Sequence, residues 1–118
     1  MAYQAPVEQI AYILDRVVDF ARIGATDRFA EATPETVTAI LTEAGKLATD
    51  VIAPVNRAGD LHPARLENGV LRSSPGFAQA FRALAEGGWI GLAADPEHGC
   101  MGLPQALNMA VNEMTASA

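Results

Sequence analysis

Apolar residues recur at three- and four-residue spacing in four stretches of the chain, which predicts four amphipathic helices. These stretches are residues 7–24, 33–59, 75–87 and 104–118. The helical period is lost between Gly59 and Pro75, where Asn68-Gly69 separates two short apolar runs and predicts a tight hairpin turn. We therefore expect an all-α fold, a bundle of about four helices with one small β-hairpin.

The first stretch predicts one continuous helix that ends at Gly24. Its main apolar stripe is Val7, Ile10, Leu14, Val17, Val18 and Ala21. A second apolar patch of Tyr12, Ile13 and Phe20 lies away from that stripe, and we expect this patch to meet another domain or subunit. Thr26 or Asp27 is expected to cap a short turn that continues to Ala32.

The second stretch begins with Thr33-Pro34-Glu35, which combines a capping hydroxyl, a first-turn proline and an early acid. An apolar line about five turns long follows, and Pro54 interrupts it. Proline removes a backbone hydrogen bond inside a helix, so we expect either a kink near Asp50 or a break there. The segment should end by Gly59.

The third stretch should begin with Ser74-Pro75 as its cap and first turn, and carries an apolar stripe of Phe77, Phe81 and Leu84. It stops at Gly87-Gly88, where glycine can supply a left-handed helix end. The run Trp89-Ile-Gly-Leu92 follows at once, which predicts a buried corner. Gly99 and Gly102 then allow unusual backbone angles.

The last helix should start at Leu103 or Pro104 and place Ala106, Leu107, Ala110, Val111 and Met114 on one face. No glycine, basic turn or proline follows Met114, so we interpret this helix as one that the sequence cuts through. In that case Met114 and Val111, with Tyr12 and Phe20, should be exposed to neighbours that are missing here.

The corner resembles the amino-terminal helical domain of the FAD-dependent acyl-CoA dehydrogenases. The residues that carry the resemblance are Gly88-Trp89-x-Gly91, then Pro96-Glu97, then Gly99-Cys100-x-Gly102, with Val51–Asp60 upstream. Cys100 departs from the pattern, because the family usually has glycine there. The opening Tyr3-x-Ala5-Pro6 and the helix after it are similar to the extension of one branch, the 3-methylmercaptopropionyl-CoA dehydrogenases.

The resemblance implies that residues 1–32 form an N-terminal extension helix and residues 33–118 the truncated N-terminal helical domain, without the flavin β domain or the C-terminal helical domain. It implies an FAD-dependent parent enzyme of fatty acid metabolism that desaturates an acyl-CoA thioester to the 2-enoyl-CoA. It also implies an electron-transfer flavoprotein as partner and a homo-oligomer. This portion would be a scaffold, inactive and free of FAD on its own.

Composition narrows the class of protein further. Eight Lys and Arg residues stand against 14 Asp and Glu, for a formal net charge of −6, which argues against a nucleic-acid surface. The single cysteine permits no internal disulfide, and no signal sequence or membrane span is evident, so we expect a soluble cytoplasmic protein.

Candidate chemistry in the sequence is weak, and we expect no catalytic, cofactor-binding or metal-binding residue. His98 and Cys100 could ligate zinc, but His62 stands alone and a second pair is missing, so turn residues are the better interpretation. Gly87-Gly88-x-x-Gly91 follows a helix, whereas a phosphate loop should follow a strand. Isolated acids are usually solvated, and we assign no acid–base role to Glu86, Glu97 or Glu113. Methionines on helices usually pack against other helices, and we expect this of Met101, Met109 and Met114.

A different class of protein remains open beside the enzyme. The chain could be a free-standing helical interaction module, whose second apolar patches bury against a partner. An interrupted enzyme domain should self-associate or bind a hydrophobic dye, whereas a finished module should be monodisperse and unfold in two states.

Overall fold

A computed structural model describes residues 2–118, and in that part of the chain the predicted all-α class with one hairpin is confirmed. The α-helices are α1 (Val7–Arg16), α2 (Phe20–Gly24), α3 (Pro34–Leu47), α4 (Ala53–Leu61), α5 (Phe77–Glu86) and α6 (Gln105–Ser117). Shorter turns are the 3₁₀ turns η1 (Asp27–Phe29) and η3 (Pro96–His98) and the π-helical turn η2 (Ala48–Ile52). The hairpin pairs β1 (Arg65–Glu67) with β2 (Val70–Arg72).

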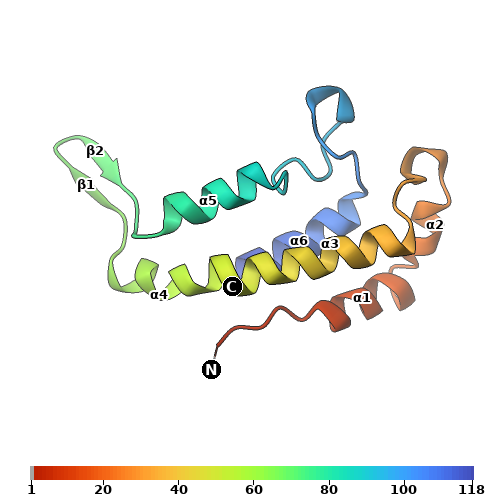
Figure 1. Ribbon diagram of the computed structural model, residues 1–118, viewed down its shortest axis with the longest axis horizontal. Coiled ribbons are helices and arrows are strands. Elements are labelled where there is room, and N and C mark those ends of the chain that lie inside the picture. The colour runs from red at the N-terminus through yellow and green to blue at the C-terminus, as the bar shows by residue number, and fades with distance from the viewer. Residues whose placement is uncertain (1) are drawn as a thin grey trace.

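The helices form a flat assembly around one long rod made of α3, η2 and α4. In Figure 1, α6 runs alongside α3, α1 lies on one side of the rod and α5 on the other. The assembly measures 53 × 38 × 18 Å along its principal axes. Its short dimension is less than two helix diameters of about 10–12 Å, so many helices have a neighbour on one side only.

The first predicted helix is broken in two, so the expectation of one continuous helix to Gly24 is wrong. The backbone amides of Val17 and Val18 both donate to the carbonyl of Ile13, and Asp19 then takes a left-handed conformation with φ of 54°. A non-glycine residue in that region costs about 1–2 kcal/mol. The break turns Phe20 into the core, where its exposed fraction is 7%. Burial of a Phe side chain contributes about 1.5–3 kcal/mol, which offsets the strain.

The second predicted helix begins as expected, because the Thr33 hydroxyl accepts a hydrogen bond from the Thr36 amide. Pro54 does not break it. The amide of Ala53 donates to the carbonyl of Ala48, five residues back, and this widened π-helical turn lets the helix continue past the proline. The distortion therefore lies around Asp50, as predicted, but the rod extends to Leu61, two residues beyond Gly59.

The hairpin forms at the predicted dipeptide, since Asn68 has φ of 50° and Gly69 has φ of 77°. Its strand residues are all exposed. The next helix starts later than expected: Gly76, with φ of 84°, precedes Phe77, and no side chain caps the helix. A glycine at Gly76 is needed for a further reason, since a Cβ there would lie 2.6 Å from Val55 Cγ1.

The main core lies where α3, α6 and α1 meet. The buried apolar residues of this cluster include Ile10, Leu14, Leu41, Ala44, Ala48, Leu92, Leu107, Val111 and Met114. Residues 3–7 pack on the same cluster as an N-terminal arm, which has no regular structure up to Pro6 and ends in Val7, the first residue of α1. The Tyr3 hydroxyl donates to the carbonyl of Met114 at 2.9 Å, and the Ala5 amide donates to Thr49 Oγ1 at 3.3 Å.

Candidate interaction surfaces of the helical scaffold

The corner after α5 closes as the glycine pair predicts. Gly88 has φ of 75°, and the amide of Trp89 donates to the carbonyl of Leu84 at 3.1 Å, five residues back. The amide of Gly88 donates to the carbonyl of Ala85 at 3.2 Å. This pair of bonds is the usual closure of a helix on a left-handed residue. Helix α5 therefore ends where the sequence indicated.

The corner is buried only in part. Leu92 is fully buried and Trp89 is half-buried against the main core, but Ile90 is 60% exposed. The prediction that the whole run is buried is therefore wrong at Ile90. The turns of the corner leave that side chain pointing to the surface while Leu92 anchors the segment. The amide of Leu103 donates to the carbonyl of Leu92 at 3.0 Å, which ties the start of the α6 segment to this anchor.

Glycines at the corner make room for side chains of the same chain. A Cβ on Gly91 would lie 2.7 Å from Cys100 Sγ, and a Cβ on Gly87 would lie 2.5 Å from Trp89 Nε1. A Cβ on Gly102 would lie 2.7 Å from Pro96 Cγ. Because protein side chains already occupy the space that these glycines provide, the corner does not form a phosphate cradle.

His98 and Cys100 take part in the local turn. Cys100 Sγ donates to the His98 carbonyl at 3.8 Å, and His98 Nε2 lies 3.7 Å from Glu97 Oε1. The Asp95 side chain accepts a hydrogen bond from the Glu97 amide and begins the η3 turn. Within residues 2–118, no group of three or more His, Cys, Asp or Glu side chains is placed to hold a metal ion.

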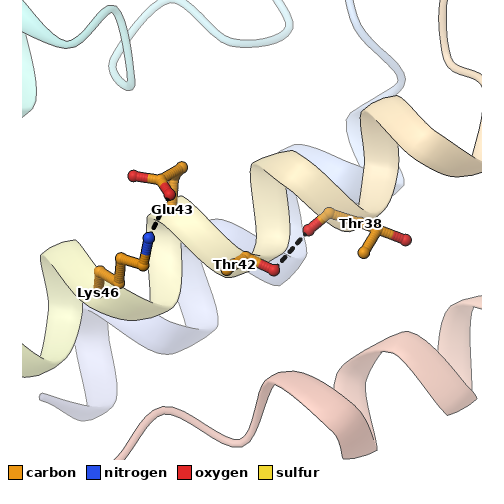
Figure 2. A network of polar contacts seen from close by, with 4 residues as sticks. All are labelled: Thr38, Thr42, Glu43 and Lys46. Atoms are coloured by element: carbon orange, nitrogen blue, oxygen red, sulfur yellow. Dashed lines mark hydrogen bonds and ion pairs between the residues drawn. The ribbon is translucent and has the colours of Figure 1, made fainter.

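Charged side chains form short surface pairs. Figure 2 shows Lys46 paired with Glu43 on α3, and Thr42 bonded to Thr38 nearby. Lys46 Nζ lies 2.6 Å from Glu43 Oε1, and the Thr42 hydroxyl donates to the Thr38 carbonyl at 2.8 Å. The hydrogen bond from Lys46 to Glu43, together with the negative charge of that carboxylate, raises the pKa of Lys46. Both side chains are exposed, so the pair belongs to the solvated surface of α3 and offers no acid–base site.

The residues described here do not fit a flavin dinucleotide. A pyrophosphate needs converging donors or cations, yet all eight Lys and Arg residues are exposed and scattered. In residues 2–118, no buried side-chain nitrogen or oxygen lacks a hydrogen-bond partner, so no such atom is left to bind a polar ligand. We therefore assign no step of flavin chemistry to this part of the chain.

The face of α6 is buried within the chain itself. Leu107 and Met114 are 0% exposed, and Val111 is 2% exposed. The expectation that Met114 and Val111 lack their neighbours is therefore wrong, because α3 and the arm of residues 3–7 cover them. Phe20 is also buried, through the break at Asp19, so it does not belong to an exposed patch.

The apolar surfaces that lack neighbours in the described structure include one on α1 and one on α5. On α1, Tyr12 is 65% and Ile13 is 47% exposed, which agrees with the second patch predicted for that helix. On α5, Phe81 is 63% and Phe77 is 43% exposed. The α5 surface was not predicted from the sequence, because a regular apolar stripe does not reveal whether another helix lies across it.

The α5 surface is hollowed into a groove between α4, α5 and the end of α6, with a volume of about 620 Å³. We call it the α5 groove, and its lining includes Val55, Phe77, Phe81, Leu84, Thr115 and Ala118. Apart from Asp60, the residues that line it carry no charge. Its chemistry is that of a packing surface, suited to apolar side chains.

Comparison with known proteins agrees with this scaffold. No family model matches the chain. All 118 residues align, at 34% identity, with the 3-methylmercaptopropionyl-CoA dehydrogenase of Ruegeria pomeroyi, and they span 20% of that protein's length. No helix in residues 2–118 is long and apolar enough to cross a membrane. The alignment extends over every residue of the chain, and it shows that the chain belongs to the acyl-CoA dehydrogenase family.

Proposed function

We propose that this chain is the amino-terminal helical scaffold of an FAD-dependent acyl-CoA dehydrogenase. Residues 1–32 would form the extension and residues 33–118 the first part of the helical domain. The alignment of the whole chain with a fifth of such an enzyme is the observation that carries this proposal.

The parent enzyme would desaturate an acyl-CoA thioester at its α and β carbons, with electrons passing to an electron-transfer flavoprotein. FAD would supply the redox chemistry from parts of the protein outside this chain. The contribution of this chain would be positional, because its rod and corner give the adjoining domains a rigid support. We further propose that the parent enzyme acts in the cytoplasm as a homo-oligomer.

The experiment is to purify the protein from its native source and measure its intact mass, visible spectrum and dehydrogenase activity. We expect a mass well above 12.4 kDa, bound flavin and acyl-CoA-dependent reduction of an electron acceptor. The substrate panel should include straight-chain acyl-CoAs and 3-methylmercaptopropionyl-CoA, the thioester that names the relative. The isolated 118-residue chain should be colourless and inactive, and a yellow, active preparation of it would contradict the proposal.

A second candidate function is a free-standing helical interaction module. The exposed aromatic side chains of α1 and α5 favour it, since such patches are common at protein interfaces. A module of this kind would have a native mass of 12.4 kDa, remain monodisperse without its partner and unfold in one transition. A larger native mass with bound flavin would exclude it.

A further inference from the structure

The chain exposes more surface than a compact domain of its size. Its radius of gyration is 16.2 Å, whereas a compact domain of 118 residues should have about 13.5 Å. Its accessible surface is 8018 Å², whereas a monomer of 12.4 kDa should expose about 6,100 Å². The excess of about 1,900 Å² is roughly twice what one partner buries in a standard protein interface. A surface of that size suits permanent coverage better than a transient contact.

The α5 groove carries Phe77 and Phe81, the exposed phenylalanines of residues 2–118. Phe77 closes one end, since its ring lies so near α4 that a Cβ on Gly59 would be 2.8 Å from Phe77 Cζ. Phe81, one turn further along α5, is 63% exposed. The main contacts of α5 are with α4 and η2, so the helix is held on one side and open on the other (Figure 1).

The end of α6 forms one wall of this groove. Thr115 and Ala118 line it, and the side-chain amide of Asn56 on α4 donates to the carbonyl of Ala118 at 2.9 Å. Ala118 is 8% exposed. Polypeptide that continues from Ala118 therefore starts inside the groove, at a fixed position and on a short tether.

We propose that in the longer enzyme the segment directly after Ala118 folds back into the α5 groove and packs on Phe77 and Phe81. This proposal depends on the proposed function, because it requires that the chain be part of a longer protein. The segment should be an amphipathic helix with apolar residues three and four positions apart, and with a Lys or Arg opposite Asp60, the carboxylate that lines the groove.

Tethering favours this occupant over a second copy of the chain. A segment attached at Ala118 binds at a high effective concentration, whereas a second copy must associate from solution. Two-fold symmetry would also place one groove against the same groove of the partner, and two concave surfaces facing each other leave a void. A convex helix of the same polypeptide fills the groove instead.

The test is hydroxyl-radical footprinting of three forms of the protein: residues 1–118, the same chain extended by about 30 residues of its own coding sequence, and the complete enzyme. Thirty residues allow a connection and one average helix. We expect the rate of Phe81 oxidation to fall about tenfold in both longer forms. Its exposed fraction in residues 1–118 is about ten times that of a buried side chain, and the oxidation rate follows this fraction. Leu71 on the hairpin, 71% exposed and outside the groove, should react equally in all three forms.

Three results would overturn the proposal. In the first, Phe81 remains reactive in the complete enzyme. In the second, Phe81 is protected in the complete enzyme but not in the extended chain. In the third, Phe81 is protected in residues 1–118 to an extent that rises with protein concentration. The second result would assign the groove to a distant part of the enzyme, and the third to a second copy. Flavin content and dehydrogenase activity are measured separately, so a complete protein without either would refute the proposed function whatever the footprint shows.

Discussion

The Gly45→Ala substitution tests how closely the N-terminal arm is packed on α3. Gly45 is buried in the last turn of α3, where the rod continues into η2, and a Cβ there would lie 2.5 Å from Val7 Cγ2. The optimal separation between carbon atoms is about 3.5–4.0 Å, so the arm would have to move by about 1 Å. That movement would also disturb the hydrogen bonds that Ala5 and Tyr3 make just before Val7 in the arm.

Two effects of opposite sign decide the outcome. Alanine is favoured over glycine inside a helix by about 1 kcal/mol, which would stabilise the variant. Overpacking a close contact costs about 1–3 kcal/mol, and Val7 cannot move aside easily because its β-branched side chain has one preferred rotamer in a helix. The difference is a net loss, so we expect Gly45→Ala to lower the free energy of unfolding by up to about 2 kcal/mol.

A double-mutant cycle with Val7→Ala separates the clash from other effects. Once the Val7 methyl groups are removed, the nearest neighbours of the new Cβ are Ala5 Cβ at 3.5 Å and Met114 Sδ at 4.0 Å, which are ordinary contacts. Gly45→Ala should then stabilise the chain by about 1 kcal/mol in the Val7→Ala background. Urea denaturation followed by Trp89 fluorescence measures all four proteins. If Gly45→Ala stabilises the wild-type background equally, the arm does not pack as described.

Three further predictions concern the core, the arm and the surface. Leu107→Ala should cost about 3–5 kcal/mol in urea denaturation, because a fully buried leucine leaves a cavity, whereas Leu71→Ala on the exposed hairpin should change stability by less than about 0.5 kcal/mol. Tyr3→Phe should cost about 1 kcal/mol and speed amide hydrogen exchange in the last turn of α6, which loses a hydroxyl partner. The pairing with Glu43 raises the pKa of Lys46 in the folded protein. The stability that this ion pair adds to the folded state is therefore fully present below the ordinary lysine pKa of 10.5, and it is lost as the pH rises through the higher pKa of the folded state. Lys46→Met should remove that part of the decline in melting temperature at alkaline pH, measured in a pH series of thermal melts. A decline equal to that of the wild type would contradict this prediction.

Local signals in the sequence predicted the ends of elements well. The capping hydroxyl of Thr33, the two positive φ angles at Asn68-Gly69 and the left-handed Gly88 all lie where expected. Each depends on a few neighbouring residues, whose backbone preferences hold in any tertiary setting.

Tertiary contacts decided what the sequence could not. The break at Asp19 is stabilised by the burial of Phe20 in a core made from distant helices, which the period of the first stretch does not reveal. The rod passes Pro54 because one widened turn costs less than disrupting the packing on both sides of it. Exposure was the least predictable property: Met114 is buried and Phe81 exposed, the reverse of what the uncapped last helix and the α5 stripe suggested.

The hydrogen bond from Tyr3 to the Met114 carbonyl has a consequence for the order of folding, since the two residues are 111 positions apart. Contacts of such long sequence separation form late, because closing the loop between them costs entropy before any packing is gained. During synthesis on the ribosome the arm leaves first, and its partner in α6 is among the last residues of this sequence to follow. Until then Val7 and Ala5 can contact only α3 and η2, and the part of their packing surface that α6 provides is missing.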